Sequence, residues 1–184
     1  MPTVNISNKM IRRCFNFSER IIIGNNQYNR LPTTINKRIE RTFVGKLAEY
    51  AFLNYLHSIN IQYDEGDMFT IYEGQENTDG FDFITSNGET IDIKSASKPF
   101  HSKIMVPIDQ FIGSPKDFYV GVKLNSEIND NGLIISETIT LATIHGYCTY
   151  KMLQNRNPRN FGEGLCRYSE LNDLNNIDYL IDKF

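Results

Sequence analysis

The chain has 184 residues, of which 40% are hydrophobic and 22% charged, which is the size and composition of one globular domain. Its three cysteines lie far apart and form no C-x-x-C pair, which argues against a disulfide framework and a zinc knot. No apolar run approaches the roughly 18 residues of a membrane span, and the first ten residues lack the apolar region of a signal peptide. These features predict a cytoplasmic protein without a membrane partner.

Charge is distributed unevenly along the chain. Residues 1–46 contain nine Lys or Arg and two Glu, whereas residues 47–93 contain no Lys or Arg and ten Asp or Glu. A nuclease needs both kinds of segment, since bases neutralise phosphates and clustered carboxylates hold divalent cations. Charge runs of this kind also occur on ordinary solvated surfaces, so the asymmetry alone does not decide between the two interpretations.

The first part of the chain divides into a basic segment and a helix. Residues 1–36 are predicted to form an irregular basic arm or subdomain, with a short helix or strand at 19–23, before a main domain at 37–184. From residue 37 to residue 59, apolar side chains recur at spacings of three and four, which is typical of an amphipathic helix.

The rest of the chain contains mostly strand patterns. Residues 81–85 and 90–96 are two short strands joined through Ser86-Asn87-Gly88-Glu89, which predicts a hairpin. β-Branched and aromatic residues indicate two later strands, and two helices are expected near the carboxyl end, the second capped by Ser169. These strands are predicted at 118–124 and 137–144, and these helices at 147–154 and from 169 onward.

The length of the hairpin loop decides which side chains share a face. A two-residue Asn87-Gly88 loop would pair Phe83 with Asp92, which mixes apolar and charged side chains on one face. A three-residue loop with Gly88 in the left-handed conformation instead brings Asp82 opposite Asp92. The hydrophobic pattern therefore predicts the three-residue loop, positive φ at Gly88, and carboxylates of Asp82 and Asp92 roughly 4–6 Å apart, within reach of one cation.

Four charged residues are candidates for chemistry. Asp92 and Lys94 alternate with Ile91 and Ile93 in a strand that otherwise reads as buried, and they point to the same face. Buried charges are costly unless they are paired or bound to metal, so we expect Asp92 and Lys94 to be paired or to bind a metal ion. Asp82 lies on the other strand of the hairpin. The fourth candidate, Glu49, lies one turn beyond Gly45, whose missing side chain is expected to allow a close approach.

A helical Glu, then an Asp, then D-x-K across a hairpin resembles the PD-(D/E)XK nuclease superfamily, which includes restriction enzymes and Holliday-junction resolvases. The resemblance covers residues 45–97 in detail and implies a restriction-endonuclease-like α/β fold with a mixed sheet of about four or five strands flanked by helices. It implies that Asp82, Asp92 and the backbone carbonyl of Ile93 hold Mg²⁺, for which Mn²⁺ substitutes. By the same resemblance, Lys94 orients the attacking water and Glu49 supports a second metal ion or its water.

Two features depart from the pattern of the superfamily. Phe81 replaces the proline for which the motif is named, and Asp79 competes with Asp82 for the role of first acid. Asp82 is preferred because Asp79 precedes Gly80, where a loop is expected.

The expected function is Mg²⁺-dependent cleavage of DNA by a restriction-type or homing-type endonuclease that acts as a homodimer. The alternatives are a Holliday-junction resolvase or other structure-specific nuclease, and an inactive DNA-binding protein of the same fold. No G-x-x-x-x-G-K-[ST] motif occurs, so no nucleotide cofactor is expected. The predicted phosphate contacts are basic residues of the first segment and of the region after the hairpin: Arg12, Arg13, Arg30, Lys37, Arg38, Arg41, Lys98 and Lys103.

Overall fold

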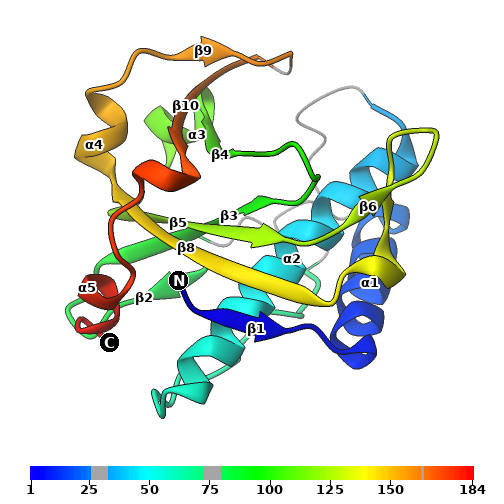
Figure 1. Ribbon diagram of the computed structural model, residues 1–184, viewed down its shortest axis with the longest axis horizontal. Coiled ribbons are helices and arrows are strands. Elements are labelled where there is room, and N and C mark those ends of the chain that lie inside the picture. Colours follow the sequence, from blue (N-terminus) through cyan, green and yellow to red (C-terminus); the bar gives the residue numbers. More distant parts are fainter. Residues whose placement is uncertain (26–32, 73–79, 163) are drawn as a thin grey trace.

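The centre of the computed structural model is a five-stranded mixed sheet, in the order β1-β8-β5-β3-β2, flanked by helices (Figure 1). The structure describes residues 1–25, 33–72, 80–162 and 164–184. Strand β3 pairs with β5 in parallel, and the other three pairs are antiparallel. The predicted α/β domain with a mixed sheet is therefore confirmed. The strands are β1 (Thr3–Asn5), β2 (Phe83–Ile84), β3 (Thr90–Ala96), β5 (Phe118–Leu124) and β8 (Leu141–Thr149).

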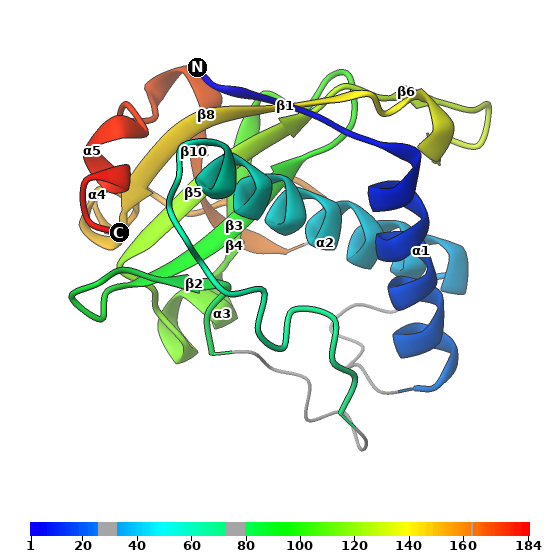
Figure 2. The same ribbon diagram turned by 90° about the horizontal axis from the view of Figure 1, so that it is seen from below.

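Two helices cover one face of this sheet. Figure 2 shows α2 (Ile35–Ser58) running across the sheet, with α1 (Asn8–Ile23) beside one end of it. The hydroxyl of Thr34 accepts a hydrogen bond from the Lys37 N–H at 3.4 Å and caps the start of α2. The predicted helix at 37–59 is thus confirmed, with its first residue two positions earlier.

The other face of the sheet carries a second layer, seen at the top of Figure 1. It contains a three-stranded sheet, β4-β10-β9, and two short helices, of which α3 connects β4 to β5. These elements are β4 (Lys103–Pro107), α3 (Ile108–Gly113), α4 (Tyr150–Gln154), β9 (Arg159–Asn160) and β10 (Leu165–Glu170). The remaining short elements are β6 (Glu127–Ile128), β7 (Ile134–Ile135), η1 (Ser136–Thr138), η2 (Leu171–Asp173) and α5 (Asp178–Ile181).

Strand β3 separates two hydrophobic cores. Ile91 and Ile93 pack in the larger core with α1 and α2, and Ala96 packs in the smaller core with the second layer. Because side chains alternate along a strand, Asp92 and Lys94 are directed toward the second layer. The charged pair of β3 therefore lies between the two layers of the molecule.

The expectation of an irregular arm at 1–36 is wrong for most of its length. Residues 8–23 form the helix α1, and Met10 and Cys14 pack in the same core as Leu47 of α2. The apolar side chains of α1 recur at spacings of three and four, but exposed basic residues between them conceal the pattern in the sequence. Residues on both sides of the predicted domain boundary therefore share one core.

The predictions near the carboxyl end are correct only in part. The strand at 118–124 is confirmed, but residues 136–138 form a 3₁₀ turn and strand β8 begins at Leu141. The predicted helix at 147–154 begins only at Tyr150, because β8 continues to Thr149. The predicted helix from Ser169 is wrong, since Ser169 is a buried residue of β10 paired with Ile104 of β4.

The three cysteines are buried free thiols. Burial raises the pKa of Cys14 and of Cys148 to about 12, so both thiols stay protonated and pack as small apolar side chains. None of the helices in the described part of the chain combines the length and the hydropathy that crossing a membrane requires.

Candidate active site

The β2–β3 hairpin has the predicted three-residue loop. Phe83 pairs with Ile91, and the Thr85 N–H donates to the Glu89 carbonyl at 2.9 Å, so that Ser86, Asn87 and Gly88 form the loop. Gly88 has a φ of +82°, the left-handed conformation that the hydrophobic pattern requires. The predicted register is therefore confirmed for residues 83–85, and the expected separation of the Asp82 and Asp92 carboxylates stays a prediction.

Asp82 lies just before the paired part of β2, which is shorter than predicted. Its N–H donates to the Ile91 carbonyl at 2.9 Å, and its carboxylate accepts the N–H of Ile93 at 2.6 Å. The Asp82 side chain thus replaces the main-chain acceptor that a longer β2 would offer to Ile93. The N–H and C=O of one strand residue point to the same side, so the Ile93 carbonyl also faces the edge where Asp82 lies.

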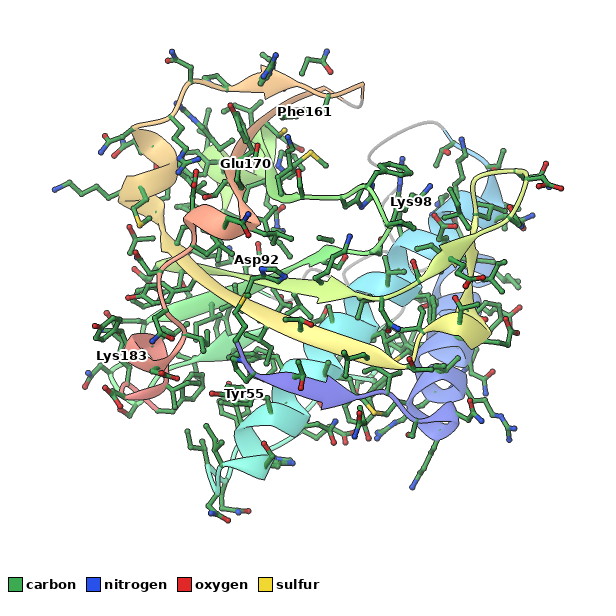
Figure 3. All side chains as sticks on the ribbon, in the orientation of Figure 1. Tyr55, Asp92, Lys98, Phe161, Glu170 and Lys183 are labelled. Carbon is green, nitrogen blue, oxygen red and sulfur yellow. The ribbon has the colours of Figure 1, made fainter. Side chains whose placement is uncertain are left out.

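Asp92 and Lys94 form an ion pair on the neighbouring face of β3. The Lys94 Nζ lies 2.7 Å from the Asp92 Oδ2, and Asp92 is 7% exposed. Gln110 of α3 contacts both side chains, because Lys94 donates to its Oε1 at 3.1 Å and its Nε2 lies 3.4 Å from the Asp92 Oδ2. Asp92 and Lys94 are therefore held by the second layer, and Figure 3 shows Asp92 near the centre of the molecule.

Glu49 reaches the same region from α2. Its Oε2 lies 2.5 Å from the Lys46 Nζ, and Lys46 is buried with its ammonium 5.1 Å from the centroid of the Phe17 ring. The expectation that Gly45 allows a close approach is wrong within the described residues, since a Cβ there would have no neighbour within 4 Å.

The carboxyl group of Asp82 is buried and lies in the electric field of the other candidate acids. Asp82 keeps some solvent exposure as a residue, but its carboxyl group is desolvated. Burial raises the pKa of Asp82 well above its usual value, the charges of Glu49 and Asp92 raise it further, and the Ile93 N–H and Lys94 oppose the shift. Ionisation of Asp82 is therefore disfavoured in the folded chain, and a bound cation would favour it.

The oxygen donors at this edge suit a hard divalent cation in kind. Mg²⁺ is usually bound by one or two carboxylates, with water and substrate phosphate completing its coordination. Asp82, Asp92 and the Ile93 carbonyl are oxygen donors of this kind. The described residues contain no group of three or more His, Cys, Asp or Glu side chains that would hold a metal ion by themselves. Asp79, the alternative first acid, lies outside the described residues.

Most of the predicted phosphate contacts lie on or near α1 and α2. Arg12 and Lys37 are exposed, and Arg38 and Arg41 follow on the first turns of α2. Arg13 instead pairs with Glu65, donates to the Tyr50 hydroxyl at 3.2 Å and stacks over Phe69.

Two other predicted contacts also have acidic partners. Lys98 lies 3.6 Å from Glu40, and Lys103 lies 3.0 Å from Glu170. Arg30 lies outside the described residues. The role of each of these basic residues in binding DNA stays a prediction.

Sequence reasoning missed two residues of the site. Gln110 joins Asp92 to Lys94, and Lys116 is a buried lysine whose pKa is lowered mainly by burial, with Asp92 and Asp82 opposing the shift. The Lys116 ammonium donates to the carbonyl and the hydroxyl of Ser114, each at 2.5 Å. Neither residue belongs to a motif, because α3 and the connection from α3 to β5 bring them to the site.

Comparison with known proteins gives no match: no family model, no curated protein and no solved structure is similar to this chain.

Proposed function

We propose that this chain is a metal-dependent DNA endonuclease of the type that its D-x-K hairpin resembles. The observation that supports the proposal best is the environment of Asp82, whose desolvated carboxyl group accepts the Ile93 N–H of β3 at 2.6 Å and lies in the field of Glu49, Asp92 and Lys94. Asp92 and Lys94 are paired, Asp82 is bonded to the residue between them, and Glu49 acts on Asp82 through its charge, where buried charges would otherwise be costly.

The proposed roles follow from the requirements of phosphodiester hydrolysis. A bound Mg²⁺ would offset the charge that develops on the phosphate and lower the pKa of a bound water. Asp82, Asp92 and the Ile93 carbonyl would hold the ion. Lys94 is positioned by its bonds to Asp92 and Gln110, and its ammonium would orient the attacking water. Glu49 would support a second ion or its water.

The proposed substrate is double-stranded DNA, and the proposed active form is a homodimer. One chain contributes one D-x-K site, so two chains are needed to cut both strands in one binding event. The exposed bases of α1 and of the start of α2 would contact phosphates, and no nucleotide cofactor takes part. A junction resolvase of the same chemistry would also act as a dimer, so the substrate is part of the test.

Cleavage of three DNA forms tests the proposal. Closed circular plasmid, a single-stranded circle and a four-way junction are incubated with the protein in Mg²⁺, in Mn²⁺ or in EDTA. We expect cleavage that requires the metal ion. The substitutions Asp92→Asn and Lys94→Ala should each lower the single-turnover rate at least about 100-fold, since each removes a group that acts on the reacting phosphate. Glu49→Gln should cause a smaller loss.

A matched control separates loss of chemistry from loss of folding. Asp130 is an exposed acid in the connection between β6 and β7, and Asp130→Asn should cut at the wild-type rate. DNA binding by Asp92→Asn should stay within a few-fold of wild type, because the substitution also removes repulsion between carboxylate and phosphate. Metal-independent binding without cleavage would favour an inactive DNA-binding protein, and cleavage by Asp92→Asn at the wild-type rate would contradict the site.

A further inference from the structure

The turn that follows β3 exposes a phenylalanine. Lys98 to His101 form a tight turn between β3 and β4, closed by the His101 N–H, which donates to the Lys98 carbonyl at 2.9 Å. Pro99 and Phe100 are its central residues. Phe100 is 68% exposed, more than any other phenylalanine that the structure describes. Single exposed apolar residues are common, so exposure alone assigns Phe100 no role.

A half-buried lysine side chain of the neighbouring strand holds the backbone of this turn. The Lys123 ammonium of β5 donates to the carbonyls of Lys98 at 2.5 Å, Pro99 at 3.3 Å and His101 at 2.8 Å. All three donors of the ammonium are thereby used on the turn. Proline at the second position also fixes the backbone. The backbone that carries Phe100 is therefore held in place, and the Phe100 ring lies against the His101 ring with 5.1 Å between their centroids.

Lys98 connects the turn to the start of α2. The Lys98 side chain reaches the start of α2, where its Nζ lies 3.6 Å from Glu40, and it donates to the Gly132 carbonyl at 2.7 Å. Lys98 is labelled in Figure 3. The first turns of α2, on either side of Glu40, carry the bases that are proposed to contact phosphates: Lys37, Arg38 and Arg41.

We propose that Phe100 is a wedge that inserts between base pairs of bound DNA. This proposal rests on the proposed function. Apolar side chains that enter a base step unstack and kink the duplex, and a rigid backbone with phosphate contacts beside it is what such an insertion needs. An aromatic ring on a firm turn, next to bases that hold the phosphates, combines these features. Insertion would also bury the exposed ring against base faces.

The chain limits how far the wedge lies from the cut. Phe100 is six residues beyond Lys94, and an extended chain spans at most about 3.3–3.6 Å per residue, so the two Cα atoms lie within roughly 20 Å. The Phe100 and Lys94 side chains add roughly 5–6 Å each, so at about 3.4 Å per base pair the insertion would lie within about nine base pairs of the cleaved bond. The substrate is therefore a duplex that is kinked close to the cut.

A topological assay measures the insertion without knowledge of the recognised sequence. Closed circular plasmid is relaxed by topoisomerase I with Asp92→Asn protein bound, and the protein is then removed. Unstacking at each bound wedge should leave the plasmid with a lower linking number, in proportion to the protein bound. The double variant Asp92→Asn/Phe100→Ala should lose most of this shift at equal occupancy, measured by gel shift. The matched control is Tyr179→Ala, because Tyr179 of α5 is 67% exposed and lies outside this region.

Fluorescence gives a second readout. The chain has no tryptophan, so Phe100→Trp introduces a single reporter. Stacking on bases should quench its emission when plasmid is added and protect it from iodide, whereas Tyr179→Trp should keep its emission. Unchanged emission of Phe100→Trp and an unchanged linking number with DNA bound would overturn the wedge alone. Absence of DNA binding would overturn the proposed function and the wedge together. Conversion of a dimer to a monomer by Phe100→Ala, seen by light scattering, would make Phe100 a subunit contact instead.

Discussion

The carboxyl group of Asp82 is desolvated and lies in the field of two other acids, Glu49 and Asp92. Its pKa in the folded chain is therefore well above the value of about 3.9 that it has in the unfolded chain. The folded state then binds more protons than the unfolded state, so the stability linked to Asp82 is present at low pH and is lost as the pH rises through its folded-state pKa.

This linkage predicts the effect of Asp82→Asn. The amide oxygen can still accept the Ile93 N–H, but the side chain no longer ionises. In EDTA, the variant should melt at a higher temperature than wild type at pH 8, by roughly 2–4 °C for each kcal/mol of repulsion removed, and at about the same temperature at pH 4. Thermal melts across this pH range measure it.

The control for this prediction is Asp130→Asn, which should follow the wild-type curve at every pH. Addition of Mg²⁺ at pH 8 should raise the melting temperature of wild type more than that of Asp82→Asn, because a cation bound to the folded state stabilises it by mass action. If the melting temperatures of wild type and Asp82→Asn change with pH in the same way, ionisation of Asp82 does not destabilise the folded chain.

Individual site residues were predictable where a local rule applied. Alternation in a strand marks Asp92 and Lys94, and the hydrophobic pattern of the hairpin selects the loop that brings Asp82 beside them. The role of Gln110 was not predictable, because its contacts depend on how α3 packs against β3. The hydrogen bond from Ile93 to Asp82 was also missed, since it depends on the point where β2 ends.

At the scale of elements, strand β8 depends on one glycine. Gly146 has a φ of +143°, and a Cβ there would collide with the Asn175 carbonyl oxygen. The Asn175 N–H and C=O are both bonded to Tyr147, so the two segments are fixed against each other. Gly146→Ala should therefore destabilise the fold by at least about 2 kcal/mol, measured as the free energy of unfolding in urea.

The matched glycine substitution is Gly45→Ala in the middle of α2. A Cβ at Gly45 meets no described neighbour within 4 Å, and alanine is the better helix former by about 1 kcal/mol. Gly45→Ala should therefore leave stability unchanged or raise it. Equal stability of the Gly146→Ala and Gly45→Ala variants would contradict the close contact between β8 and Asn175.

Elements were predictable where a strong period repeats, as in α2, β3 and β5. Ser169 illustrates the limit of local rules, since its preference for helix starts is weaker than the pairing of β10 with β4 and the burial that accompanies it. In α1, four basic residues lie between the apolar side chains, and the apolar stripe was not predicted. Charge content therefore concealed a helix that the period of three and four would have revealed.

At the scale of the whole molecule, the basic and acidic segments partly pair with each other. Arg13 and Lys46 of the basic segment bind Glu65 and Glu49 of the acidic one. Part of the asymmetry in the sequence therefore stabilises the fold. The remaining exposed bases, including Arg12 and Lys37, are the ones available for a polyanion.

Neighbouring arginines on α1 provide a test of this division. Arg12 is exposed, whereas the Arg13 guanidinium is bonded to Glu65 and Tyr50 and stacks over Phe69. If Arg12 contacts a phosphate, Arg12→Ala should make the negative slope of log K against log salt less steep by about 0.9. Adding Lys37→Ala should make it less steep by about as much again. Arg13→Ala should keep the wild-type slope and instead lower the melting temperature by about 2–4 °C, from loss of about 1 kcal/mol.

DNA binding titrated at several salt concentrations, beside thermal melts, measures both effects. The reverse result, with Arg13 changing the slope and Arg12 changing only stability, would require the Arg13–Glu65 pair to open when DNA binds.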